Sequence, residues 1–239
     1  MQGNNRLAAL LLGVGILLGF SALGYQLGQA AISYKQLDRT VVVKGLSERE
    51  YPADIVIWPI QFSVAGNQLQ PLYDEIDRNT RMIREFLMAQ GISEAAISSS
   101  PPSLMDKSAQ AYGNSSNAEF RYTAQQSVTV YSDQIDQVRA VMNSISELGK
   151  QGIVFTGMGY GVTPQYLFTR LNEVKPAMIE EATRNAREVA EKFAEDSQST
   201  LGKIRKASQG QFSISARDTN NPQIKKLRVV STVEYYLSD

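Results

Sequence analysis

The sequence contains no cysteine and no histidine. Without cysteine the chain has no disulfide, no acylated lipoprotein thiol, no thiolate zinc site and no thiol nucleophile. Without histidine it has no Ser-His-Asp triad, no histidine zinc site and no side chain whose unperturbed pKa lies near neutrality. What remains is carboxylate or lysine chemistry, oxygen-ligated metal binding, and binding without catalysis. We expect a protein that is not an enzyme, with no catalytic residues, no cofactor and no metal site, and an enzyme restricted to the remaining chemistry is the alternative.

Charged residues are also missing from Leu7–Tyr34, a run of 28 residues. A hydrocarbon core of about 30 Å needs about 20 apolar residues of helix, so this run predicts a membrane-spanning helix in residues 1–34, followed by a linker at 35–40. The alternative is a cleaved signal peptide, with residues 28–30 as the small-residue cleavage site. The apolar run exceeds the usual signal core of about 7 to 15 residues, which favours an uncleaved anchor.

The small residues of this run fall on two opposite faces of a helix, at about 100° per residue. One face contains Ala8, Gly15, Gly19 and Ala22, and the other contains Gly13, Gly24, Gly28 and Ala31. Small faces let helices approach closely, and two opposite faces suit a helix with a neighbour on each side, as in a ring. The alternative is that glycine and alanine are simply frequent in membrane helices. We expect residues 7–34 to contact the lipid bilayer and to support a homo-oligomer.

The charges are balanced and interspersed. Of 24 basic and 24 acidic residues only Arg6 precedes the end of the apolar run, so the rest of the chain has a net charge of minus one. A nucleic-acid-binding domain would be basic with clustered lysine and arginine, so we expect no nucleic-acid partner. Arg6 on one side of the run faces Lys35 and Arg39 on the other, and this balance does not set the orientation in a membrane.

Residues 41–239 are long enough for one sizeable core or two smaller lobes. They alternate strand and helix patterns, which predicts an α+β fold with antiparallel sheet packed by long amphipathic helices. The strand–helix–strand order occurs twice and indicates an internally duplicated unit. The predicted strands cover 41–45, 55–64, 97–104, 120–131, 153–168 and 226–237, and the predicted helices follow at 69–87, 135–148 and from 172 to just before Gly202.

Several single residues predict local structure. Pro59 predicts that the second strand lies at an edge or contains a bulge. Asp133 and Asn172 are placed to cap the second and third helices, and Gly202 to follow the end of the third. The polar stretch 106–118 predicts an exposed loop at which no charged or aromatic side chains converge, with a binding loop as the alternative.

Three other features have a structural and a functional interpretation. The glycines at 157, 159 and 161 are spaced like a phosphate loop, but no helix begins after them, so we interpret them as bulges. Trp58 is interpreted as core or interface packing rather than as a platform for a ligand. Basic residues would meet in one patch if the last two strands pair, and such a patch would contact anionic lipid or protect a sheet edge from aggregation. These residues are Lys203, Arg205, Lys206, Lys225, Lys226 and Arg228.

The third helix carries the most recognisable pattern, an i, i+4 row of alanines followed by Leu201-Gly202-Lys203-Ile204. The row is Ala182, Ala186, Ala190 and Ala194, and it gives the helix a flat face that can lie close to a sheet. Together with Val41–Gly45 and Lys226–Leu237, this pattern resembles the SIMPL family, also called DUF541, over Val41–Leu237. In that family Pro-Asp often stands directly before the second strand, whereas here Ala53 separates Pro52 from Asp54.

The resemblance implies an α+β domain that is exported to the bacterial periplasm or envelope, often self-assembles and has no established enzymatic activity. It supplies no catalytic residues. It favours a single-pass inner-membrane protein whose C-terminal domain lies in the periplasm, with a structural or envelope-stress role. The alternative function is a periplasmic binding module that recruits a small ligand or a protein through the loop at 106–118.

Overall fold

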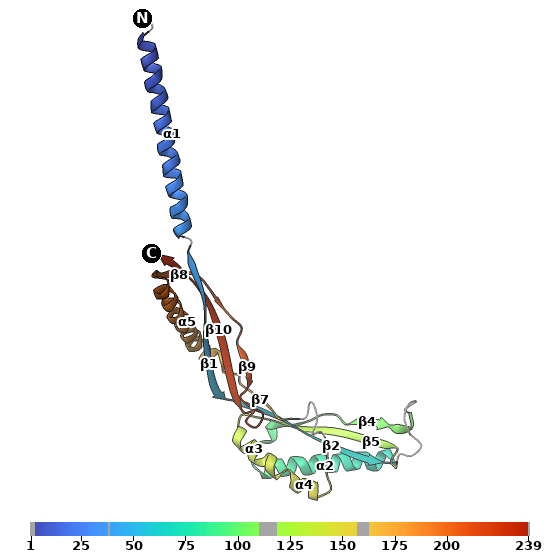
Figure 1. Ribbon diagram of the computed structural model, residues 1–239. Helices are drawn as coiled ribbons and strands as arrows, with labels where there is room; N and C mark the ends of the chain where they lie inside the picture. Colours follow the sequence, from blue (N-terminus) through green and yellow to red (C-terminus); the bar gives the residue numbers. More distant parts are fainter. Residues whose placement is uncertain (1–2, 38, 110–118, 157–162, 239) are drawn as a thin grey trace. The chain divides into compact units, whose positions relative to one another are not determined.

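The computed structural model describes residues 3–37, 39–109, 119–156 and 163–238 (Figure 1). The chain forms two compact units, so that residues 41–239 are divided between them. Unit 1 comprises Met1–Glu48, Val174–Ser213 and Arg228–Asp239, and unit 2 comprises Arg49–Glu173 and Ile214–Leu227.

The first element is a single long helix, α1 (Gly3–Leu37), of 35 residues. Its sequence is rich in leucine and alanine and contains no proline, which suits an uninterrupted helix. The helix continues three residues past Tyr34 into the predicted linker, and the first strand begins at Thr40. At about 1.5 Å per residue α1 is about 52 Å long, well beyond the thickness of a hydrocarbon core.

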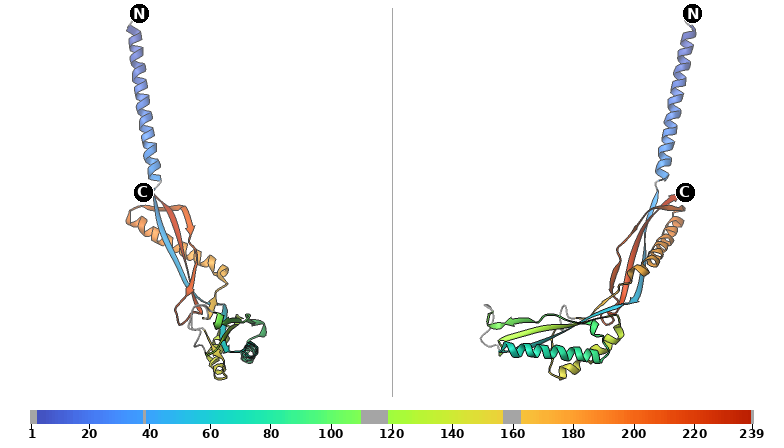
Figure 2. Two further views of the ribbon diagram at one scale, coloured as in Figure 1. Left: turned by 90° about the vertical axis from the view of Figure 1, so that its right-hand side faces the viewer. Right: turned by 180° about the vertical axis from the view of Figure 1, so that it is seen from behind.

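Unit 1 contains β8 and most of β1 and β10 from a four-stranded antiparallel sheet with the order β1-β10-β8, in which β9 also pairs with β10. These strands are β1 (Thr40–Pro52), β8 (Thr200–Gln209), β9 (Ser213–Ala216) and β10 (Ile224–Ser238). The helix α5 (Leu171–Asp196) lies along one face of this sheet (Figures 1 and 2). The predicted flat face of the helix is confirmed, since Ala182, Ala186, Ala190 and Ala194 are all buried.

A glycine lets α5 lie unusually close to β1. A Cβ atom at Gly45 would overlap the carbonyl oxygen of Ala182 and the amide nitrogen of Ala186, and it would lie 2.9 Å from the Ala186 Cβ. Val43 on the same strand packs with Val233 and Tyr235 of β10 beneath the helix. The small core of unit 1 therefore depends on a residue without a side chain where helix and strand meet.

Unit 2 contains a second antiparallel sheet with the order β3-β5-β2-β6, in which β4 also pairs with β5 and β7 with β2. Its long strands are β2 (Ile55–Gly66) and β5 (Tyr122–Ser132), which pair along their whole length. Its short strands are β3 (Ile97–Ser99), β4 (Ser103–Asp106), β6 (Val154–Phe155) and β7 (Gln165–Leu167). The predicted strand at 97–104 is thus split at Pro101 and Pro102, which cannot donate to a ladder.

The helices of unit 2 cover one face of this sheet (Figure 2). They are α2 (Leu69–Ala89), α3 (Ile135–Ser144) and α4 (Ser146–Lys150), with 3₁₀ turns at Glu94–Ala96 and Lys107–Ala109. Gly91 follows the end of α2 with a φ of 87°, and its amide donates to the carbonyl of Met88. The predicted strand–helix–strand order occurs in β2–α2–β3 and again in β5–α3–α4–β6.

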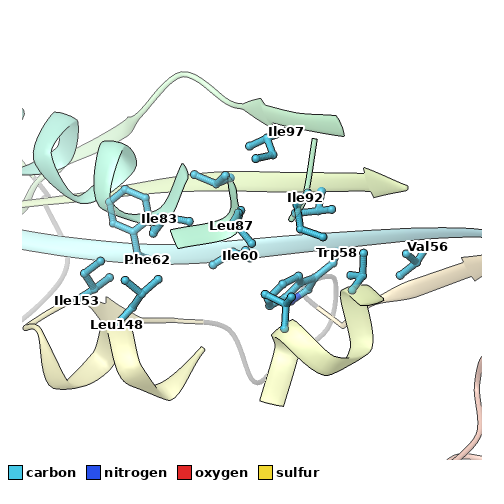
Figure 3. Close-up of a cluster of buried hydrophobic side chains, with 14 of the residues drawn as sticks. Val56, Trp58, Ile60, Phe62, Ile83, Leu87, Ile92, Ile97, Leu148 and Ile153 are labelled. Atoms are coloured by element: carbon cyan, nitrogen blue, oxygen red, sulfur yellow. The ribbon is translucent and has the colours of Figure 1, made fainter. Parts of the chain in front are cut away.

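The core of unit 2 lies between this sheet and its helices. Figure 3 shows Trp58, Ile60 and Phe62 of β2 together with Ile83 of α2 and Leu148 of α4. Phe62 is completely buried and Trp58 is 7% exposed, which confirms the interpretation of Trp58 as a core residue.

The prediction for Pro59 was wrong. β2 lies inside the sheet and pairs with β5 on one side and with β6 and β7 on the other. On that second side the described pairings involve Ile55–Ile57 and then Phe62 and Ser63, so Pro59 falls between them. Proline lacks an N–H, and it is accommodated where the described ladder is interrupted.

The predicted ends of two helices were also wrong. The N-cap of α3 is Gln134, and no side chain caps it, so Asp133 is not a cap. α5 already begins at Leu171, which places Asn172 in its first turn. The same helix ends at Asp196, and Gln198 takes the positive φ of 56°, whereas Gly202 lies within β8.

Candidate functional site

The first candidate is the apolar surface of α1. Leu11–Ala30 is long and apolar enough to cross a membrane, with a mean hydropathy of 1.6, and all of its residues are exposed. An added Cβ would meet nothing within 4 Å at any glycine of the two small faces, Gly13, Gly15, Gly19, Gly24 and Gly28. Ala22 is exposed as well, whereas the side chains of Ala8 and Ala31 lie outside the described residues. Both faces thus remain open to lipid or to another helix.

The second candidate is the base of the loop at 106–118. The carboxylate of Asp106 accepts three hydrogen bonds from the guanidinium of Arg121, the shortest at 2.8 Å, and two more from Ser108. Arg121 and Ser108 hold the pKa of Asp106 well below its usual range. The backbone of Arg121 is fixed as well, since its amide donates to the side-chain oxygen of Asn67 at 2.9 Å. Residues 110–118 lie outside the described part of the chain.

This pair corrects the expectation that no charged side chains converge at the loop. Asp106 and Arg121 are 15 positions apart. Asp106 ends β4 and Arg121 directly precedes β5, and these strands pair in the register Asp106 with Tyr122. The Arg121 guanidinium also lies 4.8 Å from the ring centre of Tyr122. The contact between Asp106 and Arg121 therefore joins the two chain segments that flank residues 110–118.

The third candidate is Asp54, in the turn between β1 and β2. Its carboxylate accepts hydrogen bonds from the backbone amide and hydroxyl of Thr169, at 2.9 and 3.1 Å, and from Arg170 at 3.3 Å. Burial raises the pKa of this carboxyl, but the bonds from Thr169 and Arg170 lower it by more, so the pKa lies below its usual value. Next to it the rings of Tyr51 and Phe168 stack at 5.5 Å. This cluster joins the β1–β2 turn to the segment before α5.

We predict that Asp54→Asn lowers the free energy of unfolding by about 1 to 3 kcal/mol at pH 7, because it weakens a charge-assisted network. The folded-state pKa lies below the unfolded value of about 3.9, so the carboxylate stabilises the fold above that pH and loses this effect as the pH falls through the lower pKa. Urea unfolding of both chains between pH 3 and 7 measures this.

Below about pH 4 the difference in the free energy of unfolding between Asp54→Asn and the parent chain should become smaller as the pH falls. Asp133→Asn is the matched control, because Asp133 is exposed and caps no helix. It should change the free energy by no more than about 0.5 kcal/mol. A constant difference between parent and Asp54→Asn across the whole pH range would contradict the role of the charge.

The predicted basic patch does not form as expected. The last two strands do pair, but Lys206 lies opposite Glu234 and Gln209 opposite Ser231, so β8 ends before it reaches residues 225–228. Arg205 forms an ion pair of 3.0 Å with Glu234 instead. The register separates the two groups of basic residues.

The described residues contain no group of three acidic side chains placed to hold a metal ion. A hollow of about 330 Å³ lies at the start of α3, lined among others by Pro52, Ala53, Gln134 and Gln223. Its lining contains no lysine and no arginine, and Asp133 and Asp136 are its only acidic residues.

Sequence reasoning missed the roles of Asp54, Arg121 and Gly45. Asp54 stands in a turn between two strands, where acidic residues are common for local reasons. Its partners Thr169 and Arg170 lie 115 and 116 positions away, and no spacing rule connects them. Pro52-Ala53-Asp54 was singled out in the sequence as the stretch that precedes the second strand, and Asp54 stands directly before β2. The sequence did not indicate the partners of the Asp54 carboxylate.

The comparison with protein families decides the affiliation. The family model described as "SIMPL: Protein of unknown function (DUF541)" matches residues 41–234. The chain belongs to the SIMPL family. The match begins one residue after the start of β1 and ends within β10. The SIMPL region therefore includes the core of unit 2 and the core of unit 1 except Tyr235, and it leaves α1 outside. None of the curated proteins compared with the chain matches it.

Proposed function

We propose that this SIMPL protein is a membrane-anchored homo-oligomer with a structural or envelope-stress role and no catalysis, and that its C-terminal domain lies in the periplasm. The observation that carries the proposal is α1. A helix that exposes apolar side chains throughout Leu11–Ala30 requires an apolar surrounding, and a bilayer supplies one.

Retention of α1 is the first prediction. We expect the mature protein to fractionate with membranes and to keep Leu7–Tyr34, because this apolar run exceeds a usual signal core. Intact-protein mass spectrometry of the purified membrane fraction measures this directly. A soluble product that lacks the first 30 residues would support the cleaved signal peptide instead. Protease treatment of spheroplasts tests the side, and digestion of the domain before lysis supports the periplasm.

Assembly through α1 is the second prediction. Gly15→Leu combined with Gly19→Leu fills one small face, so neighbouring helices could no longer approach closely. Light scattering in mild detergent should report a smaller particle than for the parent chain. Leu23→Ala combined with Leu27→Ala is the control, because both leucines lie on the side of α1 between the two small faces. A parent chain that is already monomeric would refute the homo-oligomer.

The alternative is a binding module that recruits a small ligand or a protein partner through the loop at 106–118. It is supported by the paired Asp106 and Arg121, which hold the two ends of the loop together. Deleting residues 110–118 keeps this pair and separates the two functions. The homo-oligomer should survive the deletion, whereas a partner captured by the parent chain should be lost if the loop binds it.

A further inference from the structure

Unit 1 has two open sheet edges. In the order β1-β10-β8, both β1 and β8 are terminal, and among the described residues no strand pairs with the outer edge of either. β1 runs antiparallel to β10, since the Leu237 amide donates to the Arg39 carbonyl at one end and the Ala53 amide to the Gln223 carbonyl at the other. β8 is antiparallel to β10 as well. β1 and β8 therefore run in the same direction on opposite sides of the sheet.

The β1 edge carries an apolar surface from α5. One i, i+4 row of the helix consists of Glu181, Asn185, Val189 and Phe193. The first two residues fix the row beside β1, because the Ser47 hydroxyl donates to Glu181 at 3.0 Å and the Asn185 amide to the Leu46 carbonyl at 2.8 Å. The row then continues toward the start of β1 with Val189 and Phe193, which are 39% and 54% exposed.

The β8 edge carries the matching surface. Ile204 is 49% exposed and lies opposite the buried Tyr235 of β10, on the sheet face that α5 covers. It lies at the end of the sheet where β1 begins, because Leu237 two positions further along β10 bonds to Arg39. Ile204 and the pair Val189 and Phe193 thus lie at the same level and on the same face, at opposite edges.

The charges of the two edges are complementary too. β8 contains the basic residues Lys203, Arg205 and Lys206 and no acidic residue. α5, which flanks the β1 edge, contains seven acidic and four basic residues. Opposite charges on two such edges favour contact between them, whereas like charges at one edge oppose the pairing of an edge with itself.

We propose that β8 of one copy pairs in parallel with β1 of the next copy, so that Ile204 packs against Val189 and Phe193 of the neighbour. This inference rests on the proposed homo-oligomer and specifies its interface. The contact joins two different surfaces, so repeating it continues the sheet from copy to copy, and it gives a ring when the rotation between copies closes. In each contact α5 of the neighbour covers the face of β8 that its own helix leaves exposed.

The test uses the natural absence of cysteine, which makes any introduced thiol unique. Full-length chains with Phe193→Cys and with Ile204→Cys are given tags of different size, produced together, and treated in membranes with a short bismaleimide. We expect a mixed adduct of the two chains and no adduct when either variant is produced alone. A chain that carries both cysteines should give a ladder of multimers on a denaturing gel.

Tyr131→Cys in place of Phe193→Cys is the matched control, because Tyr131 is also 54% exposed but lies in unit 2. It should give no adduct with Ile204→Cys. An adduct of Ile204→Cys with itself overturns the proposed pairing, and so does the absence of any mixed adduct while light scattering still reports an oligomer. A monomeric parent chain overturns the homo-oligomer together with this interface.

A charge pair provides a second measurement that does not depend on cross-linking. Ile204→Glu should shrink the particle to single chains, because assembly would bury an unpaired carboxylate. Adding Phe193→Lys to the same chain should restore the larger particle, since each introduced carboxylate would then meet the introduced ammonium group of the next copy. Unchanged circular dichroism shows that the variants fold. An Ile204→Glu particle of parental size counts against the interface.

Discussion

Gly45→Ala should destabilise unit 1 by at least about 3 kcal/mol, a large effect for the addition of one methyl group. The new Cβ would overlap two backbone atoms of α5, at Ala182 and Ala186. A flexible side chain could rotate away, but helix backbone cannot, so α5 has to move off the sheet. That movement opens the core formed by Val43, Val233 and their neighbours.

Thermal unfolding followed by circular dichroism in mild detergent measures this effect. Gly149→Ala is the matched control, because Gly149 lies in α4 and an added Cβ meets nothing within 4 Å. That change should be neutral or should stabilise the chain by up to about 1 kcal/mol, since alanine is the better helix former. Equal transitions for Gly45→Ala and the parent chain would show that the close approach of α5 and β1 is not required.

Phe62→Ala should destabilise unit 2 by about 3 to 5 kcal/mol. The Phe62 side chain is completely buried on β2, opposite Gln126 of β5 and Phe155 of β6, in the core shown in Figure 3. Its removal loses the burial of a large aromatic group and leaves a cavity between the sheet and two helices.

Trp58 makes this prediction specific, because it is the only tryptophan and it lies in the same core. Urea unfolding followed by Trp58 fluorescence should shift strongly for Phe62→Ala. Phe120→Ala is the control, since Phe120 is 38% exposed, and it should shift the transition far less. If the Trp58 fluorescence transition of Gly45→Ala occurs at the same urea concentration as that of the parent chain, the destabilisation is confined to unit 1. Equal shifts for the two phenylalanine variants would contradict the central position of Phe62.

Periodicity predicted most of the elements. The buried stripe of α2, the alternating burial along β2 and β5, and the alanine row of α5 are direct consequences of the 3.6 and 2.0 residue repeats. These patterns indicate which side of a helix or strand faces a core. They contain no information about which other helix or strand packs against that side.

The errors follow from that limit. Asp133 and Asn172 have the right chemistry for caps, but a cap depends on the backbone angles of the residue where the helix begins. The prediction of a basic patch was wrong because β8 pairs with residues 231–238 of β10, a register that no sequence rule anticipates. Gly45 was visible as a strand residue, yet only the position of α5 shows why no larger residue fits.

The candidate sites were less accessible from the sequence than the fold. The membrane-spanning candidate was evident in the sequence, because the thickness of a bilayer sets the number of apolar residues that a spanning helix needs. Asp106 with Arg121 and Asp54 with Thr169 join residues from separate strands or loops, so their proximity emerges only from the folded sheets. The same is true of Ile204 and Phe193, whose relation depends on which strands remain at the edges.

The short connection between α1 and β1 has a consequence for how copies meet. Only two residues separate Leu37 from Thr40, a reach of at most about 10 Å. If α1 spans a bilayer as proposed, every domain is confined to a thin layer above the same surface and diffuses in two dimensions. Assembly would then follow the number of chains per unit of membrane area, and it should persist when the suspension is diluted but weaken when lipid is added.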